Sequence, residues 1–286
     1  EWVQHAADLT WDLNDVEPAS WTQTDTYIGT VTIATRYPGV DGDVSTFSNM
    51  TFHGNVQISG GTWTHRANSG DTEAHDRLAL LVKGQFSLGA DASINLTGRG
   101  FAGTRGPGAG TSGLRMDAQR GASHGGRGGF QLVHGPGNTY GSFLHPVTLG
   151  SGGGTAMPGG GALHLEVEGP AHIDGTIEAN GLGSSMPSSS AGGSIFIHAD
   201  SVAGTGQLLT RGGTGYWGGG GGRIAVQLRS SNNFDDLIFD AAGANGNTAN
   251  SGTTLTRSGA GTVYLEGRDS HNRRVGLLRI DNRDVI

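Results

Sequence analysis

The sequence predicts an all-β protein that is built as a parallel β-helix (β-solenoid). Alternation of apolar and polar residues with a period of two is typical of a strand with one buried and one solvated face. Each alternating segment begins with glycine and keeps the same phase; the four clearest are residues 161–167, 193–199, 222–228 and 261–267. Their starts lie 32, 29 and 39 residues apart, which indicates stacked structural units.

A second short strand is predicted fourteen residues after each glycine-led strand, within 175–181, 206–212, 236–240 and 275–280. The positions related in this way are Leu163 and Ile177, Ile195 and Leu209, Ile224 and Ile238, and Val263 and Leu277. Stacked parallel strands place equivalent residues above one another, so a continuous inner row is expected. That row is predicted to contain Leu163, Leu165, Val167, Ile195, Ile197, Ile224, Val226, Leu228, Val263 and Leu265.

The same pattern extends upstream in a fainter form and defines the expected organisation of the chain. Residues 77–84 and 92–98 form a further strand pair, and residues 27–34 and 54–60 are earlier strands. Residues 1–50, with three tryptophans and no clear repeat, are predicted to be an N-terminal strand or cap region that shields the first edge. Residues 51–286 form the β-solenoid, with a glycine-rich insertion at about 98–161.

Glycine makes up 54 of the 286 residues. At the corners of a repeat it supplies positive φ or lets neighbouring backbones approach closely. The glycine-rich insertion is expected to form loops or irregular segments that project from the solenoid, with one short strand at 130–133. Helix is expected to be almost absent, because glycine disfavours it and no apolar period of 3.6 residues occurs.

Charge and composition exclude several classes of function. The formal net charge of −7 argues against nucleic acid as a partner, because non-specific binding of nucleic acid depends on clustered Lys and Arg. The absence of cysteine removes disulfides, thiolate metal sites and cysteine nucleophiles. The apolar run Leu78–Val82 is far too short to cross a bilayer, so no membrane insertion by this segment is expected. The start at Glu1 suggests a mature or trimmed chain.

Glycine doublets that precede an apolar strand resemble those of a known group of proteins. Residues 160–163, 192–195 and 221–224 are similar to the Gly-Gly-apolar repeats of polymorphic outer membrane proteins and other autotransporter-like passengers. Residues 123–129, 150–154, 175–181 and 218–223 look like glycine-rich modules of very large bacterial secreted proteins. The resemblance covers roughly residues 92–228 and implies a right-handed β-helix in an extracellular or cell-surface setting. It brings no catalytic motif.

Two regions could carry chemistry or binding. The ionisable stretch from His65 to Arg77 contains Asp71, Glu73 and His75, which alternation would place on one face of a strand. Paired carboxylates beside a histidine could act as acid and base on a sugar; the alternative is a solvated loop. Tyr216 and Trp217 stand in an almost all-glycine segment and could stack on a sugar ring or fold back over the core.

The insertion supplies a third candidate, Arg127, which together with other basic residues could receive an anionic polysaccharide; solvated loop charge is the alternative. Phe196 and Tyr264 are expected to face outward, either as part of a wet-face cluster or packed under a loop. No zinc spacing or calcium-loop ladder is present, so no metal site and no cofactor are predicted. Structural calcium at loop carboxylates is left open.

The pattern favours a non-enzymatic, extracellular or cell-surface β-solenoid that serves as a structural or adhesive module. Rigid repetition without a catalytic constellation is the basis of this interpretation. The expected partners are polysaccharide or further copies of the chain. The alternative is a carbohydrate-active β-helix enzyme, a polysaccharide lyase or glycoside hydrolase, that acts on an acidic polysaccharide; this rests on the residues around Glu73 and on analogy of fold.

Overall fold

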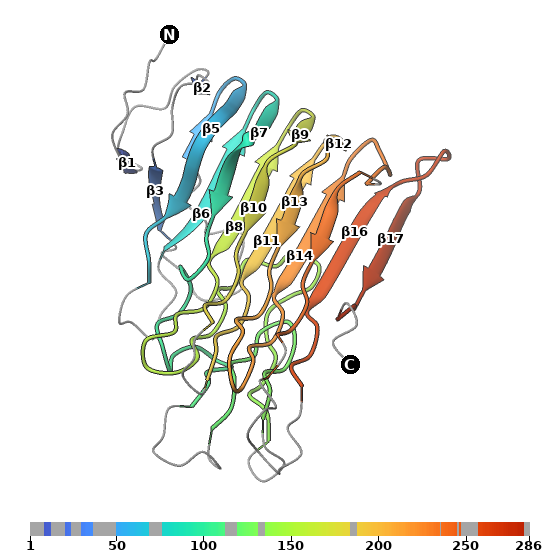
Figure 1. The fold of residues 1–286 in the computed structure, drawn as a ribbon. Helices are drawn as coiled ribbons and strands as arrows, with labels where there is room; N and C mark the ends of the chain where they lie inside the picture. The colour runs from blue at the N-terminus through green and yellow to red at the C-terminus, as the bar shows by residue number, and fades with distance from the viewer. Residues whose placement is uncertain are drawn as a thin grey trace.

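The computed structural model describes residues 9–12, 21–23, 30–36, 50–68, 76–111, 119–130, 135–183, 188–234, 236–244, 246 and 257–282. Every regular element within these residues is a β-strand, and most strands lie in two largely parallel sheets (Figure 1). The described part therefore offers no helix that could cross a membrane. The all-β class and the near absence of helix predicted from the sequence are confirmed.

The first sheet grows by one strand, or by one pair of short strands, with each pass of the chain. All of its neighbouring strands are parallel. It contains β1 (Leu9–Asp12), β2 (Trp21–Gln23), β3 (Thr30–Arg36), β5 (Val56–His65), β7 (Phe86–Asn95), β9 (Ala171–Ile173), β10 (Thr176–Glu178), β12 (Val202–Ala203), β13 (Gln207–Leu209) and β15 (Ile238–Asp240).

The second sheet faces the first across the core and is also parallel until its last strand. Strand β17 turns back along β16 and pairs with it in antiparallel fashion, and a short antiparallel contact joins β3 to β6. The members of this sheet are β4 (Met50–Phe52), β6 (Asp76–Val82), β8 (Ala162–Val167), β11 (Ser194–Ala199), β14 (Arg223–Leu228), β16 (Thr262–Arg268) and β17 (Arg274–Arg279).

The inner aliphatic row of the second sheet is continuous. Strand register places Leu163 beside Ile195, Ile195 beside Ile224, and Ile224 beside Val263. All four side chains are buried, and so are the other members of the predicted inner row except Leu265, which is partly exposed near the end of the stack. Alternation within each strand thus identified the buried face correctly, because one sheet face packs against the other sheet.

The fixed offset of fourteen residues between paired strands holds in one of the four predicted pairs and is wrong in the other three. Register aligns Ile177 with Leu208, and Leu208 with Phe239, so the separation from the first strand is 14, 13 and 15 residues in successive repeats. The turn that joins the two sheets therefore varies by one residue, which moves a side chain to the other face. As a result Ile238 points outward and is 43% exposed. Leu277 begins no new parallel strand, because β17 is antiparallel.

Glycine-rich segments form a second core in which backbones pack directly against each other. The Gly192 amide donates to the Gly220 carbonyl (3.0 Å), and the Gly221 amide donates to that of Gly259 (3.1 Å). A Cβ atom added at Gly261 would lie 1.7 Å from the carbonyl oxygen of Gly222. The backbones of successive passes are thus closer than any other residue type would permit. Corner glycines were expected from the sequence; a buried backbone core was not.

The insertion between β7 and β8 packs into this glycine core instead of projecting from it. The Gly126 amide donates to the Gly221 carbonyl (2.8 Å), and the Gly259 amide donates to the Arg127 carbonyl (2.7 Å). The expectation of projecting loops is therefore wrong for residues 119–130. Phe130 forms one isolated bridge with Arg120, and the rest of the expected strand, 131–134, lies outside the described residues.

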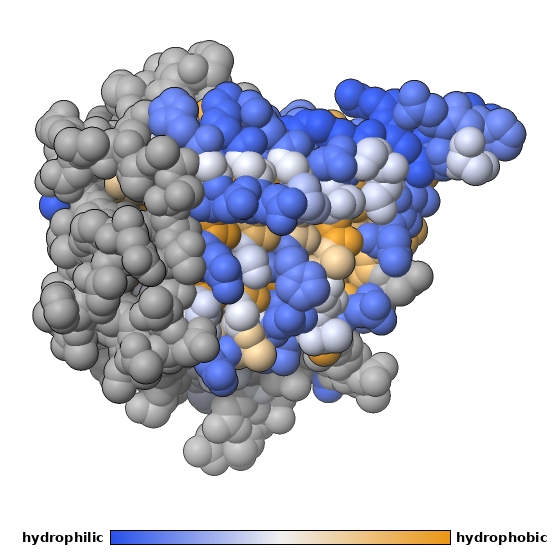
Figure 2. All heavy atoms as spheres, turned by 90° about the horizontal axis from the view of Figure 1, so that it is seen from above, coloured by the Kyte–Doolittle hydropathy of each residue, from blue (hydrophilic) through white to orange (hydrophobic). Residues whose placement is uncertain are grey.

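Strands β1, β2 and β3 are the described elements of the N-terminal region, and the tryptophans of the predicted cap lie outside the described side chains. The cap remains a prediction. At the other end, the β16–β17 hairpin projects as a hydrophilic arm (Figure 2). The same view shows polar rows that flank a band of apolar residues across the stacked passes.

Two buried histidines tie separate segments of the chain together. The Nδ1–H of His124 donates to the Gly192 carbonyl (2.7 Å), and its Nε2 accepts from the Thr148 hydroxyl (2.8 Å). The Nδ1–H of His65 donates to the Arg66 carbonyl, and its Nε2 accepts the Ala162 amide. Burial lowers the pKa of each imidazole to about 3, so both rings are neutral at pH 7.

Because the pKa values of these two histidines are lowered in the folded state, we expect acid to destabilise the fold. Above pH 6.5 they are neutral in both states and contribute no pH dependence. Below pH 6.5 the unfolded chain binds protons that the folded chain rejects until about pH 3. The free energy of unfolding should therefore fall by up to about 1.4 kcal/mol per pH unit for each buried histidine. Urea unfolding between pH 8 and pH 4 measures this slope.

The substitution His124→Asn tests whether the buried imidazole of His124 contributes to this pH dependence. Asparagine can still donate to Gly192 but cannot take up a proton, so the slope should become shallower even if stability at pH 7 is lower. His271→Asn, at an exposed position on the β16–β17 hairpin, is the matched control and should leave the slope unchanged. An unchanged slope in the His124 variant would contradict the assignment.

Candidate functional site

The predicted catalytic candidates Asp71, Glu73 and His75 lie outside the described residues, and their role stays a prediction. His65, which opens the same stretch, is fully buried between two backbone partners. Its surroundings are those of a structural residue. Among the described residues, no group of three or more His, Asp or Glu side chains is placed to hold a metal ion.

The structure brings the three predicted binding residues to the glycine core. The Gly129 amide donates to the Gly218 carbonyl (2.8 Å), which places the segment of Arg127 beside that of Trp217. Arg127 is exposed and Tyr216 is half-buried, with its ring 5.3 Å from that of Trp217. The Trp217 side chain is only 2% exposed, which favours the interpretation in which this ring covers the core rather than stacks on a sugar.

A groove of about 400 Å³ lies on the outer face of the second sheet, and none of the residues predicted for catalysis or ligand binding lines it. Its floor is made by the side chains that alternate along each strand with those of the inner row. In each strand, one set of alternate residues therefore packs in the core and the other set faces the groove. Register forms one outer ladder from His164, Phe196, Ala225 and Tyr264, and a second from Glu166, His198, Gln227 and Glu266.

Part of the insertion forms one wall of the groove. His145 stands edge-on to Phe196, with ring centroids 5.3 Å apart, and His164 stacks on the other side of that ring at 5.1 Å. Gln227 donates from Nε2 to the carbonyl of Leu144 (3.0 Å). Phe196 is therefore buried under the insertion, and Tyr264 is partly buried beside it. Of the two sequence alternatives for these aromatic residues, the packed one is confirmed.

The middle of the groove holds an ion-paired cluster that spans three strands. Arg229 donates from Nη2 to Glu166 Oε1 (3.0 Å) and from Nη1 to the carbonyl of Val167 (2.6 Å). His198 Nδ1 lies 3.5 Å from the same carboxylate oxygen. The interaction with His198, assisted by the positive charge of Arg229, lowers the pKa of Glu166 and keeps it ionised.

The far end of the groove carries an excess of positive charge. Arg268 on β16 and Arg274 on β17 are directly opposite each other in the antiparallel register, and both line the groove. Arg274 lies 3.5 Å from Glu266, whose other carboxylate oxygen accepts the Tyr264 hydroxyl (2.8 Å). Arg268 has no carboxylate partner among the described residues and donates to the carbonyl of Asn272. Like charges directly opposite in a sheet repel each other, so an anion between them is favoured.

The two carboxylates of the groove are both engaged by neighbouring side chains, which disfavours a hydrolytic pair. Glu166 and Glu266 lie in the same outer ladder three strands apart, and each has its own partners. Glu266 accepts the Tyr264 hydroxyl and lies 3.5 Å from Arg274. Glu166 is moreover neutralised by Arg229. The arrangement suits electrostatic recognition better than acid–base hydrolysis.

Sequence reasoning missed most of this groove because its residues come from four repeats and from the insertion. A signal was present: the polar positions of the glycine-led segments carry histidine, glutamate, glutamine and tyrosine instead of the Ser and Thr of an inert sheet face. The sequence pointed to Phe196 and Tyr264 as outward-facing aromatic residues and to His145 as one of the basic residues of the insertion, but not to a shared groove. The arginine pair depends on the hairpin, which the expected parallel stacking did not foresee.

No protein-family model, curated protein or solved structure matches the chain. The resemblance to glycine-rich surface modules therefore remains an expectation, and the function has to be argued from the site.

Proposed function

We propose that the chain is a non-enzymatic β-solenoid module that binds an acidic polysaccharide in the groove of its second sheet. The observation that carries this proposal is the pair Arg268 and Arg274, two guanidinium groups opposite each other at the rim of the groove. A uronic acid carboxylate or a sugar sulfate placed there would accept hydrogen bonds from both and remove their mutual repulsion.

The size and polarity of the groove support a sugar ligand. A volume of about 400 Å³ falls within the range of small-molecule sites, and a polysaccharide can continue along a groove that is open. Gln227 and His198 supply polar atoms for hydroxyl groups, and Phe196 and Leu228 supply the apolar part of the lining. The lining has three arginines against two carboxylates, so an anionic ligand is preferred over a neutral one.

The in-register parallel pairing supports the β-solenoid as the finer description of the fold. Every pass from β5 to β16 adds to each sheet at a similar register, as expected when a chain winds around one axis. A right-handed winding follows the general preference of parallel crossovers. A rigid, glycine-rich module of this kind without cysteine fits an extracellular or cell-surface protein with an adhesive or structural role.

A lyase acting on an acidic polysaccharide is the second candidate. The groove holds imidazoles and guanidinium groups together, which are types of group that move a proton and neutralise a uronate beside it. Two observations weigh against it. Burial, together with the hydrogen bond to Glu266, raises the pKa of the Tyr264 phenol, and Glu166 is held ionised in the middle of the site.

Binding to a polysaccharide panel tests the proposal. We expect polyuronates and sulfated glycans to bind, and neutral glucans not to bind, in calorimetry at low salt. Arg268→Gln should weaken binding about tenfold, the value of one charge-assisted hydrogen bond. The same change should leave thermal stability equal or slightly higher, because it removes a like-charge contact.

The control variants separate this site from its alternatives. Arg273→Gln, on the same hairpin but paired with Asp269 away from the groove, should bind normally. Weakening by Arg127→Gln but not by Arg268→Gln would overturn the groove in favour of the glycine-core site. Release of unsaturated products that absorb in the ultraviolet, lost in His198→Ala, would establish the lyase instead of the binding module.

A further inference from the structure

Three side chains in the middle of the groove share their hydrogen-bonding atoms. We call Glu166, His198 and Arg229 the central cluster. Arg229 Nη2 lies 3.0 Å from Glu166 Oε1 and 3.4 Å from His198 Nδ1, and that ring nitrogen lies 3.5 Å from the same carboxylate oxygen. Each of the three side chains is about one-third exposed, so a ligand in the groove can reach them.

Uptake of a proton by His198 changes what its Nδ1 atom can do. A guanidinium only donates, so the neutral imidazole accepts at Nδ1 from Arg229. A protonated imidazole has two N–H donors and no acceptor, so Nδ1–H then donates toward Glu166. The interaction with His198 also lowers the pKa of Glu166, so this carboxylate stays ionised in mild acid. One N–H of Arg229 thereby loses its imidazole acceptor and becomes available to a ligand.

The charge of the central cluster changes in the same step. With a neutral imidazole it holds one carboxylate and one guanidinium, and with an imidazolium it has one net positive charge. Histidine is the side chain that ordinarily changes its charge between pH 5 and 8. His164 on β8 is different, because burial lowers its pKa to about 4 and keeps its ring neutral in that range. The other titratable or charged groups that line the groove are His145, Glu266, Arg268 and Arg274.

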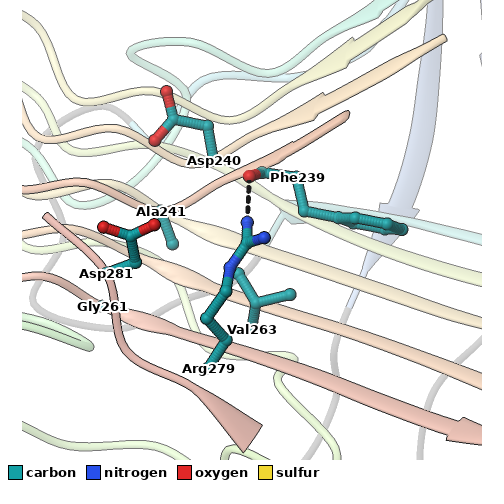
Figure 3. A pocket seen from close by; sticks show the side chains of 7 residues that line it. All are labelled: Phe239, Asp240, Ala241, Gly261, Val263, Arg279 and Asp281. Atoms are coloured by element: carbon teal, nitrogen blue, oxygen red, sulfur yellow. Dashed lines mark hydrogen bonds between the residues drawn. The ribbon is translucent and has the colours of Figure 1, made fainter. Parts of the chain in front are cut away.

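Arg279 on β17 shows why an arginine by itself does not make a subsite for an anion. It donates to the carbonyl of Phe239 (2.6 Å), as Figure 3 shows. The hollow beside it has a volume of about 10 Å³, which is room for one water molecule. Asp240 and Asp281 line the same hollow, and their negative charge disfavours an anion there. The central cluster, by contrast, lies in a groove that is large enough for a sugar.

We propose that the central cluster becomes a second anion-binding subsite when His198 takes up a proton, so that in mild acid the groove holds two anionic groups of one glycan chain. The inference rests on the proposed function, in which Arg268 and Arg274 bind the first anionic group. Two contacts on one chain reinforce each other, because the second forms within the complex already made by the first. A glycan with charged groups on successive sugars is therefore preferred over one with isolated charges.

Dextran sulfate is the probe, because its sulfate groups stay ionised between pH 8 and pH 5.5 and only the protein titrates. Uncharged dextran has the same backbone and should not bind at either pH. In calorimetry at constant ionic strength we expect binding about tenfold tighter at pH 5.5 than at pH 8, the value of one additional charge-assisted hydrogen bond. Titrations at pH 6.5 in buffers of different ionisation enthalpy should show that binding takes up a proton.

Three variants locate the effect. His198→Gln should remove most of the gain in affinity at pH 5.5, because glutamine cannot acquire a charge. His172→Gln is the matched control: it also deletes one of the 11 histidines, but His172 is exposed on the first sheet and paired with Asp174, so the gain should remain. Glu166→Gln should tighten binding at pH 8, because it leaves Arg229 without a carboxylate partner. Circular dichroism verifies that each variant is folded at both pH values.

The possible outcomes separate this subsite from the groove as a whole. Equal affinity at pH 8 and pH 5.5, together with weaker binding by Arg268→Gln, would refute the second subsite and leave the proposed function in place. A gain that persists in His198→Gln, or that disappears in His172→Gln, would refute the subsite too. Absence of binding at both pH values, or binding that Arg268→Gln does not weaken, would refute the groove itself.

Discussion

Gly261→Ala should prevent the protein from folding at 25 °C. The added Cβ would lie 1.7 Å from the Gly222 carbonyl oxygen and 2.8 Å from the Gly221 carbonyl carbon, both of them backbone atoms that no side-chain rotation can move. The Gly261 amide also donates to the Ala241 carbonyl (2.8 Å), so the strand cannot shift without losing that hydrogen bond. We expect a cost of more than about 4 kcal/mol, seen as loss of the cooperative urea transition that the unsubstituted protein shows.

Gly135→Ala is the control for this result. Gly135 has a positive φ of 66°, but an added Cβ meets no atom within 4 Å. Alanine there should cost about 1 to 2 kcal/mol, from the left-handed backbone alone. Equal effects at the two positions would show that backbone conformation, and not close approach, accounts for the glycines of the second core.

Ile195→Asp should destabilise the protein to a comparable extent, because it disrupts the apolar core between the two sheets. Ile195 is fully buried and stands in the inner row between Leu163 and Ile224. An aspartate there would place a carboxylate without a partner in an apolar stack, which is among the costliest single substitutions. We expect loss of the folded state, seen as loss of the far-ultraviolet β-sheet spectrum and of protease resistance.

Ile238→Asp provides the matched comparison, since it introduces the same group on a strand of the same stack. Ile238 faces outward on β15 and is 43% exposed, so a carboxylate there can reach water and the change should cost no more than about 1 kcal/mol in the free energy of unfolding. A loss at this position as large as that at Ile195 would contradict the assignment of inner and outer faces.

The sequence was sufficient to predict the buried row because alternation is local. Within the glycine-led strands, whether a residue such as Ile197 faces the core depends only on its place in its own strand. The second strands were less predictable. Their phase depends on turns that differ by one residue, and neither Leu208 nor Phe239 carries a local signal that distinguishes it from its neighbour.

The groove and the glycine core could not be read from local patterns. Arg268 and Arg274 meet only because β17 reverses direction, and Phe196 is covered only because the insertion crosses the second sheet. Glycine has no side chain to alternate, so a buried glycine and a loop glycine look the same in a sequence. The sequence indicated that backbones approach each other closely at the repeat corners. It did not indicate which segment of the chain each glycine contacts.

The way in which the insertion is embedded also constrains the kinetics of folding. In a simple repeat array each unit contacts its neighbours alone, so structure can spread from any point. Here residues 121–129 hydrogen-bond to residues 218–221 and to Gly259, roughly a hundred positions further along the chain. Contacts of such long sequence separation slow folding. Residues 121–129 can therefore complete their hydrogen bonds only after the last passes of the chain are available, and a partly synthesised molecule would leave these bonds unmade.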